Sequence, residues 1–196
     1  EGTVSNENQF FLWTPDDGSL TADGAHIHAD EGGAPESVAG IKLWTVTTED
    51  GKLRPADVQS QCFDMDFVHR AQPGVVSITQ SSEMGTVYTP AEVAALAEVA
   101  HAPGLALHMD GARLSNATAS LGVPLRAFTI DAGVDLLSLG LTKNGAMLAE
   151  SVVILNPERV RGVDFLRKTS MQLASKMRFL SAQYVALLTD DLWLTS

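Results

Sequence analysis

The chain has 196 residues, of which 45% are apolar and 19% are charged, so it can form one large domain around a hydrophobic core. Its formal net charge of −11 argues against binding to nucleic acids, because an acidic surface repels phosphate backbones. The single cysteine, Cys62, excludes a disulfide within the chain, and no apolar stretch of the sequence is long enough to cross a membrane.

The first part of the chain is predicted to be a loop. Up to about Asp23 it is polar and is interrupted by Pro15 and Gly18, which favours irregular structure with at most a short helix. Its opening residues lack the basic start and apolar run of a signal peptide, so we expect a cytoplasmic protein. The pattern becomes regular from Gly74 onward, where the β-branched run at 75–79 predicts a buried strand.

A helix is predicted to follow that strand. Thr89 can cap the helix, Pro90 suits its first turn, and Glu92 completes a capping box. Apolar residues then recur at helical spacing up to Ala100, and the Pro-Gly pair at 103–104 ends the helix.

Strands and helices continue to alternate along the chain. Apolar runs predict strands at 105–109, 134–139 and 151–155, and a short helix is predicted at 114–121. This alternation is typical of an α/β fold in which a mostly parallel sheet is flanked by helices. The tail at 161–196 differs, because its apolar residues recur at intervals of three, four and seven, which predicts one long helix or two.

Polar side chains follow two of the predicted strands. Asp110 and Arg113 come after the strand at 105–109, and Lys143 comes after the strand at 134–139. Ligands of open α/β sheets bind at the carboxyl ends of strands, so these three side chains could converge on one anionic ligand. Pyridoxal phosphate (PLP) needs such a set: a lysine for the Schiff base, a carboxylate for the pyridine nitrogen, and cations or N–H groups for the phosphate. Taken alone, the pattern also fits a helix-capping aspartate, a solvated lysine and a surface ion pair.

Five segments, in order along the chain, resemble low-specificity L-threonine aldolases. These enzymes belong to the β-eliminating-lyase group of fold type I PLP enzymes, whose large domain is of the aspartate-aminotransferase type. The segments are HIHADEGGAPE at 26–36, SITQSSEMGTVYTP at 77–90, LHMDGARLSNA at 107–117, TKNGAMLAESVVILNP at 142–157 and LASKMRFLSAQYVALLTDDLWL at 173–194. The resemblance implies the same fold and PLP as the cofactor.

The resemblance also implies a role for each matching residue. Lys143 is expected to form the Schiff base, Asp110 to bind the pyridine nitrogen, and His26 to stack over the cofactor ring. Arg113 is expected to bind the substrate carboxylate or the phenolic oxygen of the cofactor. His26 and His28 stand close together, but no third ligand is near them in sequence, so we expect no metal site.

Phosphate binding is expected from residues near the two ends of the chain. Gly2 and Thr3 fall where the family has its phosphate-binding Gly-Thr turn, and Arg178 falls where an arginine reaches a phosphate across the dimer. In family terms, 1–160 is the PLP-binding large domain without its N-terminal part. The tail at 161–196 is the long helix that leads toward a C-terminal small domain missing from the chain.

The implied activity is cleavage of a β-hydroxy-α-amino acid, such as L-threonine, to glycine and an aldehyde. The base that removes the β-hydroxyl proton is left open between His26, acting directly or through water, and Ser82 or Glu83, because the family's second histidine is absent at 79–83. Leu141 replaces a glycine that the family prefers, and it would place a bulkier side chain near the cofactor. The expected assembly is a homodimer or homotetramer. The alternatives are a PLP-dependent β-eliminating lyase and an inactive or partner-dependent remnant of the scaffold.

Overall fold

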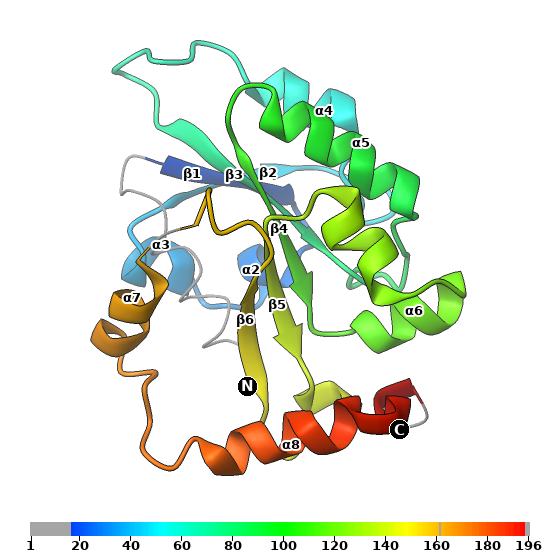
Figure 1. Ribbon diagram of the computed structural model, residues 1–196. Coiled ribbons are helices and arrows are strands. Elements are labelled where there is room, and N and C mark those ends of the chain that lie inside the picture. Colours follow the sequence, from blue (N-terminus) through cyan, green and yellow to red (C-terminus); the bar gives the residue numbers. More distant parts are fainter. Residues whose placement is uncertain (1–16, 161, 195–196) are drawn as a thin grey trace.

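One six-stranded sheet organises the molecule, in the order β2-β1-β3-β4-β5-β6 (Figure 1). The computed structural model describes residues 17–160 and 162–194. The first five strands of that order run parallel, and β6 pairs antiparallel with β5. This arrangement confirms the predicted α/β class with a mostly parallel sheet. The strands are β1 (Asp17–Ala22), β2 (Lys42–Val46), β3 (Gln72–Thr79), β4 (Ala106–Gly111), β5 (Leu136–Gly140) and β6 (Glu150–Ile154).

Helices lie on both sides of the sheet. Figure 1 shows α4, α5 and α6 on one side, α3 and α7 on the other, and α8 below the lower ends of β5 and β6. No helix in the described part of the chain is long and apolar enough to cross a membrane. The α-helices are α2 (His26–Ala29), α3 (Ala34–Val38), α4 (Pro55–Gln61), α5 (Pro90–His101), α6 (Leu114–Leu121), α7 (Val163–Thr169) and α8 (Arg178–Leu188). The 3-10 helices are η1 (Leu125–Phe128), η2 (Ile130–Ala132), η3 (Thr142–Asn144) and η4 (Thr189–Leu194).

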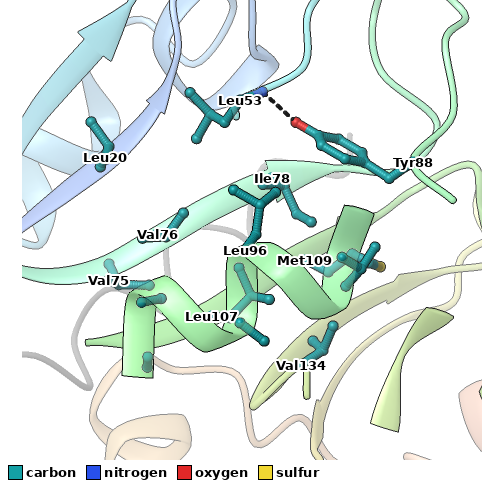
Figure 2. Close-up of a cluster of buried hydrophobic side chains, with 14 of the residues drawn as sticks. Leu20, Leu53, Val75, Val76, Ile78, Tyr88, Leu96, Leu107, Met109 and Val134 are labelled. Atoms are coloured by element: carbon teal, nitrogen blue, oxygen red, sulfur yellow. Dashed lines mark hydrogen bonds between the residues drawn. The ribbon is translucent and has the colours of Figure 1, made fainter. Parts of the chain in front are cut away.

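The helix predicted from its capping box is α5. The Glu92 N–H donates to the Thr89 hydroxyl at 3.3 Å, and the Thr89 N–H donates to the Glu92 carboxylate at 2.7 Å. Leu96 on the buried face of α5 joins a cluster with apolar side chains of β3 and β4 (Figure 2). Side chains alternate along a strand, so Ile78 and Met109, which pair in register, face this cluster together.

The expectation of a loop up to about Asp23 is wrong for the stretch that forms β1. This strand lies inside the sheet, between β2 and β3, yet two of its side chains are the hydroxyls of Ser19 and Thr21, both fully buried. Such a strand has little apolar signal for sequence reasoning to detect. The strand β2 was not predicted either. In the tail, α7 and α8 are two separate helices, in agreement with the two-helix alternative. The expectation of one long helix over 161–196 is wrong, because the segment at 170–177 is not helical and has positive φ angles at Met171 and Lys176.

A buried hydrogen bond connects the segment before α4 to the segment before α5. The Leu53 N–H donates to the Tyr88 hydroxyl at 2.7 Å, as Figure 2 shows, and both residues are almost fully buried. Burial raises the pKa of the Tyr88 phenol, so the side chain stays neutral and remains a suitable partner for the amide.

We predict that Tyr88→Phe lowers the free energy of unfolding by about 1–3 kcal/mol, because the buried Leu53 N–H then has no acceptor. Urea denaturation followed by circular dichroism measures the loss. Tyr184→Phe is the matched control, since that hydroxyl is only half-buried, and its loss should be less than about 1 kcal/mol. Equal stability of Tyr88→Phe and the wild-type chain would contradict this account of the core.

Candidate functional site

Side chains from adjacent parallel strands meet at one edge of the sheet. The strands β1, β3, β4 and β5 are neighbours and run in the same direction, so their carboxyl ends lie at the same edge. His26 begins α2 shortly after β1, Asp110 is near the end of β4, and Lys143 lies in η3 just after β5. The topology therefore brings together three residues that the sequence singled out separately.

Asp110 is held rigidly within the sheet. Its backbone pairs in register with Thr79 of β3 on one side and with Ser138 of β5 on the other. Its side-chain oxygen Oδ1 accepts the Ala112 N–H at 3.0 Å, and the residue is only 6% exposed. The carboxylate thus has a fixed position at the strand end, as a group that must meet one atom of a ligand requires.

Lys143 is exposed, although the turn that carries it is anchored. The next residue, Asn144, is buried and donates from Nδ2 to the Trp193 carbonyl at 2.6 Å, while the Ser115 hydroxyl donates to its Oδ1. Gly145 then adopts a φ of 94°, a left-handed conformation that favours glycine. A fixed backbone with an accessible amine suits a lysine that must reach a ligand.

His26 has a partner that the sequence analysis did not identify. Its Nδ1 lies 2.8 Å from Oε1 of Glu31, whose side chain is completely buried, whereas the imidazole is 29% exposed. A buried carboxylate on one ring nitrogen fixes the orientation of the ring and leaves its other nitrogen for other contacts. Glu31 lies within the same HIHADEGGAPE segment as His26, so the spacing of the two residues was a signal available in the sequence.

Arg113 forms an ion pair with the loop that follows β3. Its Nη1 lies 2.9 Å from Oε2 of Glu83, and both side chains are partly buried. Ser82, the other residue considered as a base in this loop, shares a hydrogen bond of 2.6 Å with the Thr86 hydroxyl. Of these two candidates for the base, Glu83 is therefore the one whose side chain contacts a predicted site residue, Arg113.

The remaining predicted site residues are those expected to bind the phosphate. Gly2 and Thr3 are outside the described residues. Arg178 is the first residue of α8, and its guanidinium lies over the ring of Phe179, 4.8 Å from the centroid. No group of three histidine, cysteine, aspartate or glutamate side chains suited to a metal ion occurs within 17–160 and 162–194.

Glu150, which the sequence analysis did not single out, adds a carboxyl group at this edge. It is the first residue of β6, and it pairs with Gly140 at the end of β5. Burial raises the pKa of its carboxyl, as does the negative charge of Asp110, whereas hydrogen bonds from Thr142 and the positive charge of Lys143 lower the pKa. The charges of Asp110 and Lys143 thus both act on the same carboxyl group.

His108 lies beneath the site, on the same face of β4 as Asp110. Its two ring nitrogens are 2.8 Å from the Ser77 hydroxyl and 3.2 Å from the Ser138 hydroxyl. Burial lowers the pKa of the imidazole to about 3, so it is neutral near pH 7 and serves as a polar core residue.

Three comparisons relate the chain to known proteins. Residues 1–195 match the family model described as beta-eliminating lyase. Low specificity L-threonine aldolases of Pseudomonas sp. (strain NCIMB 10558) and Pseudomonas aeruginosa are each 44% identical over 176 residues, which cover 89% of this chain and 51% of those proteins. The solved structure of Leishmania major threonine aldolase is similar with a TM-score of 0.92 at 32% identity, covering 99% of this chain and 57% of that one. The chain spans about half the length of the curated relatives it matches.

The buried imidazole predicts acid sensitivity. The folded chain binds a proton at His108 only near pH 3, whereas the unfolded chain does so near the ordinary pKa of 6.5. The stability contributed by neutral His108 is therefore present above pH 6.5 and decreases as the pH falls below that value, by about 1.4 kcal/mol per pH unit.

Between pH 7 and pH 5 the wild-type chain should therefore lose about 2 kcal/mol more unfolding free energy than His108→Gln. Urea unfolding at both pH values measures the difference, and His28→Gln, at an exposed position, controls for the loss of one imidazole. If the wild-type chain and His108→Gln lose the same amount, the assignment of His108 as a neutral core residue is wrong.

Proposed function

Since the chain belongs to the beta-eliminating lyase family, we propose that it binds PLP at this edge of the sheet and cleaves β-hydroxy-α-amino acids. L-threonine, cleaved to glycine and acetaldehyde, is the expected substrate. The observation that supports the proposal most is the placement of Lys143, Asp110 and His26 at the ends of neighbouring parallel strands. The 44% identity to threonine aldolases points to the same chemistry.

The residues at this edge fit PLP by the chemistry of their side chains. The exposed amine of Lys143 can form a Schiff base with the aldehyde of the cofactor. The buried carboxylate of Asp110 can hold a proton on the pyridine nitrogen, and the imidazole of His26 can stack over the ring. When bound, PLP supplies an electron sink for the breaking Cα–Cβ bond. The phosphate is assigned to Gly2, Thr3 and Arg178.

Arg113 is proposed to bind the substrate carboxylate while it remains paired with Glu83. A guanidinium carries five N–H donors in a planar fork, so one ion pair does not exhaust its capacity. We propose His26 as the base that takes the β-hydroxyl proton, because Glu31 fixes its ring through Nδ1.

We propose that the active form is a homodimer or homotetramer. Several apolar side chains of α7 and α8 are exposed, including Phe165 at 81%, Phe179 at 63% and Val185 at 67%. Surfaces of this kind are usually covered by another protein surface. Sedimentation analysis tests the assembly. The cytoplasmic location expected from the sequence stays a prediction.

We predict that the chain mixed with PLP develops an absorbance band at roughly 410–430 nm, which borohydride removes by reducing the Schiff base. Lys143→Ala should lack the band, because this variant has no amine at the position proposed to form the Schiff base. Lys168→Ala, which removes an exposed lysine of α7, is the matched control and should keep it. A folded wild-type chain without the band would overturn the proposal.

We further predict that the chain with PLP releases acetaldehyde from L-threonine, and that Asp110→Asn lowers kcat at least about 100-fold, because a neutral amide no longer favours a protonated pyridine nitrogen. A coupled alcohol dehydrogenase assay measures the aldehyde. A chain that shows the absorbance band but releases ammonia and a keto acid instead of acetaldehyde would be a β-eliminating lyase rather than an aldolase.

A further inference from the structure

The carboxyl group of Glu150 fills the space beside Gly140. A Cβ atom built on Gly140 would lie 2.6 Å from Oε2 of Glu150 and 3.2 Å from Cα of Ala112. A side chain at position 140 would therefore displace the Glu150 carboxyl and press on the backbone of Ala112. The carboxyl of Glu150 thus lies between the end of β5 and the segment that follows Asp110.

This carboxyl is bound to the turn that carries Lys143. Thr142, the first residue of η3, donates to Glu150 from both its hydroxyl and its backbone N–H. The same hydroxyl accepts the Ala149 N–H at 3.3 Å, which leaves its hydrogen free to point at the carboxylate. Two hydrogen bonds to one carboxylate thus fix the residue immediately before the lysine.

The charged groups that act on Glu150 come from three other elements. Asp110 lies on β4, Lys143 lies in η3, and Tyr184 faces it from α8. Burial raises the pKa of the Tyr184 phenol to about 12, so this side chain carries no charge near neutral pH. Among the described residues, Lys143 is therefore the cation, and Asp110 the anion, whose charge acts on the Glu150 carboxyl.

We propose that Glu150 is a positioning residue for Lys143: it holds the start of the lysine turn through Thr142 and places a negative charge close to the lysine nitrogen. The inference rests on the proposed role of Lys143 in binding PLP. A carboxylate at this place would stabilise a positive charge on the nitrogen that links the lysine to the cofactor. A residue with a purely structural role would orient the turn without affecting the positive charge on the nitrogen of Lys143.

The placement of Glu150 can be tested on the cofactor-free chain. The carboxyl carbons of ¹³C-labelled glutamates are titrated by NMR, and the Glu150 signal is assigned by its absence in Glu150→Gln. Lys143→Met should raise the pKa of Glu150, and Asp110→Asn should lower it, since each change removes one of the charges that act on it. An unchanged pKa in Lys143→Met would overturn the inference.

The effect of the charge is tested on the chain loaded with PLP. The pH at which the absorbance band of the Schiff base changes should fall by about one pH unit in Glu150→Gln, which removes the charge but keeps a hydrogen-bond acceptor. Thr142→Val, which keeps the charge, should shift that pH much less. Glu158→Gln is the matched control, because Glu158 is an exposed glutamate after β6.

Equal midpoints in Glu150→Gln and the wild-type chain would overturn the inference even if both bind PLP. Absence of the band in the wild-type chain would overturn the proposed function instead. The NMR titration of the cofactor-free chain, which does not depend on PLP binding, would then still test whether the charge of Lys143 acts on Glu150. If Glu150→Gln does not fold, the comparison of Lys143→Met with the wild-type chain decides the question, with the Glu150 signal assigned in Glu150→Asp.

Discussion

The parallel pairing of β1, β3, β4 and β5 is the interaction on which the site depends, because it brings Asp110 of β4 to the same edge as the segments that follow β1 and β5, which carry His26 and Lys143. The register is fixed where β5 begins. The buried carboxylate of Asp135 accepts the Leu107 N–H at 2.8 Å and the Asn156 Nδ2–H at 2.8 Å, while the Asp135 N–H donates to the Leu107 carbonyl at 2.9 Å. A slip of one residue between β4 and β5 would break these bonds and turn every side chain of the strand to the other face. Correct pairing at the start of the strands therefore guarantees the positions of Asp110 and Lys143 at their ends.

The central strands have one apolar face and one polar face, and the polar face leads to the site. Paired residues such as Ile78 and Met109 pack into the core beneath α5, whereas the alternate pair of Ser77 and His108 is hydrogen-bonded on the other side. Continuing along the same face, the next position of β4 is Asp110. Burying a neutral imidazole between two hydroxyls costs stability as the pH falls, yet it satisfies both ring nitrogens without adding a charge beneath Asp110. The side chains beneath the Asp110 carboxylate on this face are thus polar but uncharged.

Much of this arrangement could be predicted from the sequence. The regular elements from β3 to β6 were recognised because their strands are apolar and the capping residues of α5 are typical ones, and Lys143 and Asp110 were recognised because each follows a strand. β1 was missed because hydroxyl side chains fill two of its buried positions. Glu31 and Glu150 were missed for a different reason. Their importance depends on contacts that the fold creates, between α2 and the turn after it, and between β6 and the turn of η3. For Glu31 the sequence offers one sign, its short spacing from His26, whereas nothing in the sequence indicates the contact that Glu150 makes.

The lysine turn is held from two directions, which explains how an exposed side chain can still be precisely placed. On one side, Glu150 of β6 binds Thr142. On the other side, Leu141 is buried in a second apolar cluster with Leu187 and Trp193, and Asn144 donates to the Trp193 carbonyl. Leu141, which was expected to place a bulkier side chain near the cofactor, therefore packs toward α8 and η4, where it adds apolar contacts to the turn. Because the backbone on both sides of Lys143 is already ordered, forming a bond at its amine costs only the rotamer freedom of one side chain. The tail of the chain thus contributes to the site by fixing the turn that carries Lys143.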